Sequence, residues 1–138
     1  MNKEVSRLSE EDIEEYISFI SEVFGYIPKF DDIKSMIKNE ITLIIKNEDM
    51  VIAAISIEKK REYIKGLDYY HINYFGVLKQ YRRMGYATIL FKEVEALAKE
   101  NNINYLELTS GNQRKSAHYF YQKNDFKIKD TTVFVKLY

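Results

Sequence analysis

The amino-acid sequence predicts an α+β protein of three layers, in which a mixed, mostly antiparallel central sheet is flanked by helices. Three observations carry this prediction. Strand-like segments are grouped in the first half, a strand and a helix then alternate, and two short strand-like segments end the chain. A chain of 138 residues has room for one hydrophobic core, so we predict a single domain over residues 1–138.

The first segments of the chain predict a short strand followed by two helices. Residues 4–8 have the composition of a strand. Ser9 and Asp12 stand at the spacing of a capping box, with Asp in the Glu position, and predict the start of a helix. Gly25 predicts its end, because glycine readily adopts the left-handed conformation found there. A second, shorter helix is expected to begin at residue 31 or 32 and to continue to residue 38.

The middle of the chain predicts a hairpin and a longer strand. Residues 41–46 and 51–59 are strand-like and are separated by the polar turn Asn47-Glu48-Asp49. Residues 60–67 are charged and contain a glycine, so they predict an exposed loop. Residues 68–78 are rich in Tyr, Ile, Phe and Val and predict the longer strand.

The second half of the chain predicts two helices and three short strands. Residues 85–100 have the apolar spacing of an amphipathic helix, and residues 105–109 predict a buried strand. A last helix follows, with three apolar or aromatic residues on one side: Ala117, Phe120 and Tyr121. Residues 126–129 and 132–137 predict a terminal hairpin.

Composition argues against several classes of function. The sequence has no cysteine, which excludes disulfides, thiolate metal sites and a thiol nucleophile. Its two histidines, His71 and His118, lie far apart in the sequence and do not predict a zinc site. The 21 basic residues balance 21 acidic ones, so no overall field attracts nucleic acid or an anionic membrane. Apolar runs are short and the first residues are charged, so we predict no membrane segment, no secretory signal and a cytoplasmic protein.

The most informative segment is the turn from Gln80 to Ala87, which joins the longer strand to the amphipathic helix. The first N–H groups of a helix have no intrahelical acceptors, and the helix dipole favours an anion beside them. Gly85 allows the backbone to approach such an anion closely, and Arg82 and Arg83 add cationic donors. The pattern is suited to a phosphate group, although a basic loop before a helix can equally be plain solvated surface.

The segment from Val77 to Ala87 resembles the acyl-CoA signature of the GNAT superfamily of N-acetyltransferases. In that signature a Val closes the fourth strand, and Arg or Gln, two residues, Gly, one residue, and Gly or Ala follow. The resemblance implies that acetyl-CoA is the co-substrate. It implies that its pantetheine arm pairs with the fourth strand at Phe75, Gly76 and Val77. It also implies that its pyrophosphate is held by one run of the turn: Arg82, Arg83, Met84, Gly85, Tyr86 and Ala87.

A second stretch, residues 106–121, resembles the family's fifth strand and following helix, which commonly ends in Ala-His-x-Phe-Tyr. The two matches together cover roughly residues 70–129. The resemblance gives Tyr121 the role of the acid that protonates the departing thiolate, since a phenol stays protonated at neutral pH. The alternative is that Tyr121 only packs on its helix, while Tyr119 points across that helix. Asn112 is implied to line the cofactor, although it could instead cap the helix.

The general base is not defined by the sequence. Some members of the family carry two acidic residues after His-Ile in the fourth strand, but Asn73 and Tyr74 occupy those places here. Glu107, His71 and a chain of water molecules remain as alternatives. A single His on a strand is often a structural residue.

These observations lead to one main hypothesis and two alternatives. The main hypothesis is an enzyme that moves an acetyl group from acetyl-CoA to a primary amine of a small-molecule or peptide acceptor. The amine attacks directly in a ternary complex. The first alternative is a non-catalytic acyl-CoA-binding or regulatory module, and the second is a nucleic-acid-binding domain, which the neutral net charge disfavours. We also consider a homodimer, in which two copies of the chain pair through the terminal hairpin.

Overall fold

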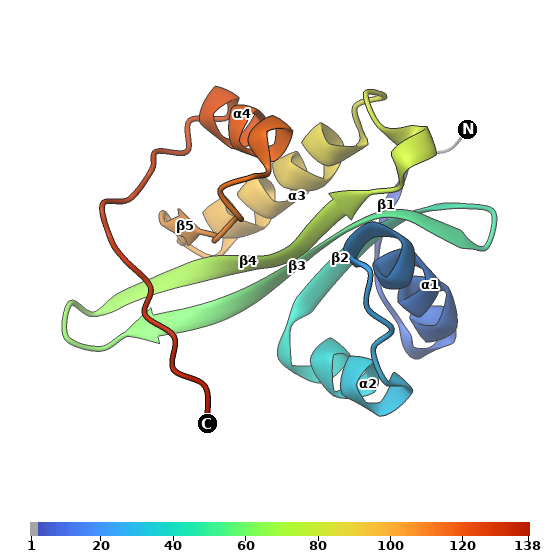
Figure 1. The fold of residues 1–138 in the computed structure, drawn as a ribbon, viewed down its shortest axis with the longest axis horizontal. Helices are drawn as coiled ribbons and strands as arrows, with labels where there is room; N and C mark the ends of the chain where they lie inside the picture. The colour runs from blue at the N-terminus through green and yellow to red at the C-terminus, as the bar shows by residue number, and fades with distance from the viewer. Residues whose placement is uncertain (1–2) are drawn as a thin grey trace. The chain divides into compact units, whose positions relative to one another are not determined.

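The computed structural model describes residues 3–138 as two compact units (Figure 1). The first unit ends at Leu108 and contains every strand, and the second unit is Thr109–Tyr138. The single domain over residues 1–138 stays a prediction.

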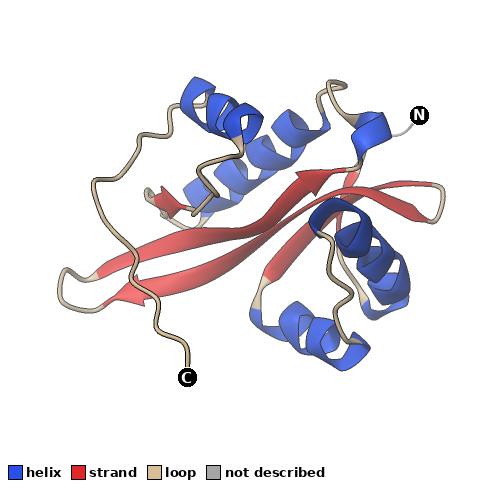
Figure 2. Cartoon of the chain, in the orientation of Figure 1, coloured by secondary structure: helices blue, strands red, loops and turns tan. Residues whose placement is uncertain are grey.

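A five-stranded sheet forms the centre of the first unit, with the strand order β1-β2-β3-β4-β5 (Figure 2). Its strands are β1 (Val5–Arg7), β2 (Ile41–Asn47), β3 (Met50–Glu62), β4 (Leu67–Val77) and β5 (Leu106–Glu107). The first four strands are antiparallel to their neighbours, whereas β5 runs parallel to β4. The predicted mixed, mostly antiparallel sheet is therefore confirmed.

Helices cover both faces of this sheet. The helices α1 (Ile13–Phe24) and α2 (Phe30–Asn39) lie on one face, and α3 (Tyr86–Glu100) lies on the other (Figure 1). Because both faces are covered, β3 is buried without alternation from Val51 to Ile57. Within residues 3–138, no helix is both long and apolar enough to cross a membrane.

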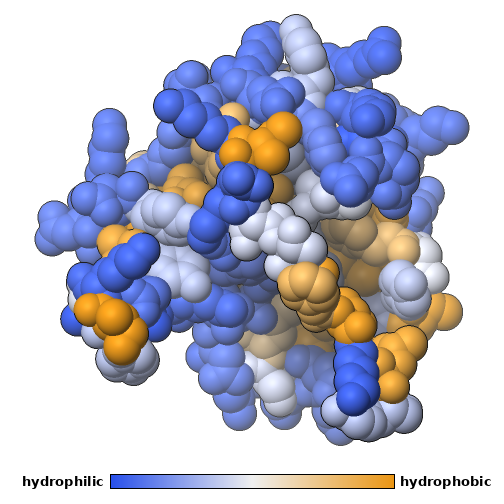
Figure 3. Space-filling model, turned by 60° about the vertical axis from the view of Figure 1, so that its left-hand side comes forward, coloured by the Kyte–Doolittle hydropathy of each residue, from blue (hydrophilic) through white to orange (hydrophobic). Residues whose placement is uncertain are grey.

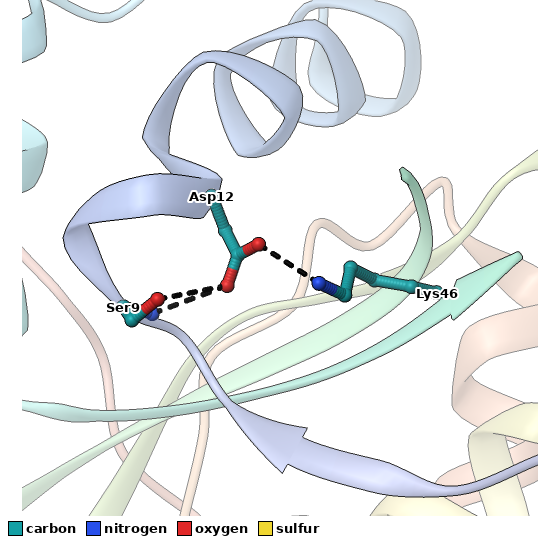
Figure 4. A network of polar contacts seen from close by, with 3 residues as sticks. All are labelled: Ser9, Asp12 and Lys46. Carbon is teal, nitrogen blue, oxygen red and sulfur yellow. Dashed lines mark hydrogen bonds and ion pairs between the residues drawn. The ribbon is translucent and has the colours of Figure 1, made fainter. Parts of the chain in front are cut away.

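The start of α1 shows the predicted capping pattern, preceded by one 3-10 turn, η1 (Glu10–Asp12). The Asp12 carboxylate accepts hydrogen bonds from the Ser9 hydroxyl at 3.1 Å and from the Ser9 backbone N–H at 3.4 Å. The Lys46 ammonium of β2 donates to the same carboxylate at 3.0 Å (Figure 4). Burial alone would raise the pKa of Asp12, but these donors outweigh it and lower the pKa. The cap thus fixes α1 to the sheet.

The charged segment after β3 is more regular than the sequence predicts. Instead of a loop over residues 60–67, β3 continues to Glu62 and β4 begins at Leu67. The Arg61 guanidinium pairs with the Asp68 carboxylate at 3.0 Å across the two strands. The Glu62 carboxylate accepts the backbone N–H groups of Ile64 and Lys65, which closes the turn. Charged side chains that pair across an antiparallel ladder are compatible with an exposed strand.

The predicted terminal hairpin over residues 126–129 and 132–137 is wrong. After α4 (Lys115–Lys123), the described part of the chain contains no further helix or strand. A strand is stabilised by a paired neighbour, and apolar composition alone does not provide one. The last segment instead leaves several large side chains exposed: Val133, Phe134, Val135, Leu137 and Tyr138. On the face drawn in Figure 3, hydrophobic patches lie between hydrophilic areas.

Candidate active site

β4 contains a bulge immediately before the residues that the sequence assigns to the pantetheine arm. Ala54 of β3 pairs with Gly76 and Ser56 pairs with Asn73, so Tyr74 and Phe75 stand opposite the single residue Ile55. The left-handed residue of the bulge is Tyr74, with φ of 48°, and not Gly76. A bulky residue with positive φ is strained, and backbone strain of this kind occurs often at functional sites.

Gly76 is required for a different reason, the close approach of α1. A Cβ atom at this position would lie 2.8 Å from Val23 Cγ1 and 3.4 Å from Phe24 Cζ. Both neighbours belong to the last turn of α1. The absence of a side chain therefore sets the distance between the end of α1 and β4.

The outer edge of β4 is only partly occupied by β5. The parallel pairing is limited to Tyr70 with Leu106 and His71 with Glu107. From Ile72 to Val77, no strand of the described residues pairs with this edge. Phe75, Gly76 and Val77 all lie beyond the pairing with β5, where the main chain of β4 can meet an extended ligand.

The turn after β4 has an irregular backbone that is suited to an anion. It begins with one 3-10 turn, η2 (Lys79–Tyr81), and then has two left-handed residues, Arg83 with φ of 64° and Gly85 with φ of 88°. A Cβ atom on Gly85 would meet no atom within 4 Å, so the space in front of this residue is open. Gly85 is also the N-cap of α3, where the helix dipole favours negative charge.

The side chains around this turn carry positive charge. The Arg82 Nε–H donates to the Val77 carbonyl at 3.1 Å, which ties the turn to the end of β4. The Lys3 ammonium donates to the Met84 carbonyl at 2.9 Å and lies 5.2 Å from the centre of the Tyr86 ring. Sequence reasoning missed Lys3, because it lies 81 residues before Met84 and belongs to no motif.

The structure therefore brings most of the predicted cofactor residues onto one continuous strand, turn and helix. The residues from Phe75 to Val77 lie on β4, Arg82 to Gly85 form the turn, and Tyr86 and Ala87 begin α3. The other two predicted residues, Asn112 and Tyr121, belong to the second unit.

In the second unit, Tyr121 lies on α4 and is half-buried. Its ring contacts Phe120 at 5.9 Å and Phe126 at 5.6 Å between ring centres. Burial raises the pKa of Tyr121, and the charge of Arg114 offsets only part of this rise, so the phenol remains protonated at neutral pH. Tyr119 is exposed, on the other side of the helix. Asn112 is exposed in the segment before α4.

Two of the residues considered as a base lie together on β4 and β5. His71 Nδ1 and Glu107 Oε1 are 3.4 Å apart, and the Tyr105 hydroxyl donates to Glu107 Oε2 at 3.3 Å. In β4, His71 and Asn73 are two residues apart, so their side chains leave the same face of the strand.

A pocket of about 570 Å³ lies on this face, between α1, α2 and β4. Aromatic side chains make up much of its wall: Tyr16, Phe24, Tyr26 and Tyr74. Phe24 and Tyr74 meet edge to face, with 6.1 Å between ring centres. The left-handed backbone of Tyr74 is thus part of the pocket wall.

Two polar groups of this pocket come from segments that the sequence analysis did not single out. Glu40, at the C-terminal end of α2, accepts a hydrogen bond from Asn73 Nδ2 at 3.1 Å. The Tyr16 hydroxyl is buried and has no hydrogen-bond partner among the described residues. Burial raises the pKa of Tyr16 to about 12, and the neighbouring Ser56 hydroxyl, which is not placed for a hydrogen bond of good geometry, offsets only part of this rise. Neither residue belongs to a local motif, so only the folded chain reveals them.

The chain belongs to the acetyltransferase (GNAT) family, whose model matches residues 6–126. The strand, turn and helix from Phe75 to Ala87 lie inside this match. No curated protein sequence matches the chain at a significant level.

Solved structures show the same fold at low sequence identity. An acetyltransferase from Trypanosoma brucei is 16% identical with a TM-score of 0.81, and the match covers 97% of this chain and 99% of that one. An aminoglycoside 6'-N-acetyltransferase from Acinetobacter baumannii is 19% identical with a TM-score of 0.82, covering 98% and 97%. A ribosomal-protein-alanine N-acetyltransferase from Brucella melitensis is 14% identical with a TM-score of 0.81, covering 98% and 99%. The predicted three-layer α+β fold is confirmed.

Proposed function

We propose that this acetyltransferase moves the acetyl group of acetyl-CoA to a primary amine by direct attack in a ternary complex. The observation that carries the proposal is the strand, turn and helix from Phe75 to Ala87, in a chain that belongs to the family. Among the similar structures, one protein is named for an aminoglycoside and another for a ribosomal-protein alanine. Both names are consistent with an amine acceptor.

The residues present fit the acyl donor in two respects. The β4 edge from Ile72 to Val77 lies beyond its pairing with β5, and we assign the pantetheine arm to the main chain of this edge. The turn offers the N-terminal end of α3, two left-handed residues and open space at Gly85 to the pyrophosphate. Lys3 and Arg83 add positive charge near this point. We assign the donor to this region and Asn112 to its lining.

The chemistry of the transfer requires a polarised carbonyl and two proton transfers. Acetyl-CoA supplies a thioester carbon that an uncharged amine can attack. We assign the polarisation of its carbonyl to a backbone N–H near Val77. A carbon–nitrogen bond forms, the carbon–sulfur bond breaks, and the amine loses one proton while the thiolate gains one. We assign the second transfer to the Tyr121 phenol, which burial keeps protonated.

The proton of the attacking amine needs a separate acceptor. Asn73 and Tyr74 cannot supply carboxylates from β4, but His71 of β4 and Glu107 of the neighbouring β5 lie 3.4 Å apart. We propose this pair as the acceptor, either directly or through water. The resulting acid and base are two different residues.

The test of this function measures binding and turnover separately. Acetyl-CoA should raise the melting temperature of the protein, and free CoA should appear when a panel of primary amines is added. Tyr121→Phe should lower kcat by about 10- to 100-fold and leave the stabilisation by acetyl-CoA unchanged, because general acid catalysis contributes on the order of 10²–10⁴-fold. Tyr119→Phe is the matched control, since that phenol is exposed on the other side of α4.

Each result has a distinct meaning. Unchanged turnover in Tyr121→Phe overturns the assignment of the acid. Stabilisation by acetyl-CoA without turnover on any amine supports the non-catalytic acyl-CoA-binding module instead. No stabilisation by acetyl-CoA overturns the placement of the donor.

A further inference from the structure

The pocket between α1, α2 and β4 is separate from the residues assigned to the acyl donor, and its chemistry is specific. We propose that it binds a small primary amine with a flat apolar body. This amine would be the acceptor of the reaction, an inference that rests on the proposed acetyl transfer. Its binding can be tested without that reaction.

The walls of the pocket favour a flat apolar group. Three rings form this wall: Phe24 at the end of α1, Tyr26 in the segment after it, and Tyr74 on β4. Ile20, Ile33 and Met36 add aliphatic surface from α1 and α2. The volume of about 570 Å³ is that of a site for a small molecule. A flat ring can stack against such a wall, whereas a fully hydrated sugar or polyamine gains little from it.

The charges of the pocket favour a cation. Its two charged lining residues are both acidic, Asp32 and Glu40, and none of the described residues that line it is basic. The hydrogen bond from Asn73 Nδ2 to Glu40 Oε1, at 3.1 Å, fixes the orientation of the carboxylate without neutralising its charge. The neighbouring aromatic faces also attract a cation. An ammonium group is therefore favoured over an alcohol or an acid of the same shape.

A third observation concerns a buried polar group beside the pocket. Tyr16 is one of the lining residues, and its hydroxyl is buried and makes no hydrogen bond of good geometry within residues 3–138. The nearby Ser56 hydroxyl is engaged with the Thr42 hydroxyl at 2.7 Å. Buried polar groups are nearly always paired, so this hydroxyl leaves unused hydrogen-bonding capacity directly behind the pocket wall.

The strain at Tyr74 belongs to the same site. Its backbone adopts φ of 48°, and its ring meets Phe24 edge to face. Strain of this kind persists where the surrounding structure fixes the residue, and it occurs often in ligand sites. The bulge thus orients one aromatic wall of the pocket.

The experiment compares ligands that differ in one property, with acetyl-CoA absent. Binding to the whole chain is measured by calorimetry for 2-phenylethylamine, for 2-phenylethanol, which lacks the ammonium group, and for spermidine, which lacks the ring. We expect 2-phenylethylamine to bind at least about tenfold more tightly than either of the others. Glu40→Gln should weaken its binding about tenfold and leave the binding of 2-phenylethanol unchanged. Glu22→Gln is the matched control, because Glu22 is exposed on α1 and does not line the pocket.

Two results overturn the proposal: tighter binding of spermidine than of 2-phenylethylamine, or equal binding of 2-phenylethylamine to the protein and to Glu40→Gln. Circular dichroism of the variant shows that a loss of binding is not a loss of folding. Acetylation of spermidine but not of 2-phenylethylamine also overturns this acceptor class and leaves the proposed transfer intact. Glu40-dependent binding of 2-phenylethylamine without its acetylation supports the pocket as a binding site and contradicts its role as the acceptor site.

Discussion

The donor region and the acceptor pocket meet at β4 but are built in opposite ways. The donor region, from Phe75 to Ala87, is continuous in the sequence and offers mainly backbone: a strand edge beyond the pairing with β5, two left-handed residues and a helix N-terminus. The acceptor pocket collects side chains from α1, α2 and β4, which are separated by many residues. In the donor region, the residue type at each position is limited by the backbone φ and by the space available for a side chain. In the pocket, the residue type is limited by the charge and polarity that the ligand requires.

Because of this difference, substitutions in the donor region and substitutions in the pocket should have different effects on binding. A change that adds a side chain to the donor region should alter binding through backbone geometry and charge. A change in the pocket that keeps its volume should alter only the ligand it prefers.

The largest effect is expected from Gly85→Glu. A residue with a side chain resists φ of 88°, and its carboxylate would project into the open space where the pyrophosphate is assigned. We expect acetyl-CoA to lose its effect on the melting temperature, which corresponds to a loss of about 100-fold or more in affinity. Differential scanning fluorimetry with increasing acetyl-CoA measures it.

The matched control for this change is Gly66→Glu, in the turn between β3 and β4. Gly66 also has positive φ, 65°, so the variant carries the same charge and a similar backbone cost of about 1 kcal/mol. It should be destabilised to a similar extent and still respond to acetyl-CoA. If Gly85→Glu also responds like the wild-type protein, the pyrophosphate lies elsewhere.

A smaller effect, on stability, is expected from Gly76→Ala. The new Cβ would lie 2.8 Å from Val23 Cγ1, so α1 must move away from β4. Overpacking of this kind costs about 1–3 kcal/mol in free energy of unfolding, which urea denaturation measures. The double variant with Val23→Ala should recover part of the loss, because the two changes act on one contact. Strictly additive losses would show that this contact is not what excludes a side chain.

The smallest effect at pH 7 is expected from Tyr16→Phe, which removes a hydroxyl with no partner in the described structure. Its free energy of unfolding should change by less than about 1 kcal/mol, and acetyl-CoA should stabilise it normally. A loss of several kcal/mol would mean that the hydroxyl makes a hydrogen bond in solution.

The same variant makes a prediction at alkaline pH. The pKa of Tyr16 is raised to about 12 in the folded protein, against 10.0 as its ordinary value. The neutral phenol therefore stabilises the fold fully below pH 10, and this contribution is lost as the pH rises toward 12. The wild-type protein should lose up to about 2–3 kcal/mol more than Tyr16→Phe over this window, as measured by denaturation at each pH.

Much of the fold could be predicted from the sequence, because the relevant signals are local. The alternation of apolar residues, the cap at Ser9 and Asp12, and the glycine at the end of α1 each act within a few residues. The terminal hairpin was wrongly predicted, since residues 126–137 have strand composition but find no paired neighbour. The opposite error occurs at residues 60–67, where the charged composition predicts a loop but β3 and β4 continue. The Arg61–Asp68 ion pair across the two strands helps to stabilise them.

The residues of the candidate site also divide into those with a local sequence signal and those without one. The donor turn was predicted because its residues are contiguous and follow a known spacing. Lys3, Tyr16 and Glu40 were missed, since each reaches its place only through the tertiary fold. Gly76 directly follows the bulge, but steric contact with α1 explains this glycine, and Tyr74 carries the left-handed backbone.

The contact between Gly76 and α1 also has a thermodynamic consequence. One side of the Gly76 backbone is assigned to the acyl donor. The other side packs closely against Val23 and Phe24, and Phe24 also lines the pocket. A small displacement of β4 by one substrate is thus passed directly to the wall that meets the other. The two affinities should then depend on each other by the same factor, whichever substrate binds first. The dissociation constant of each substrate, measured with and without the other, would then change by the same factor.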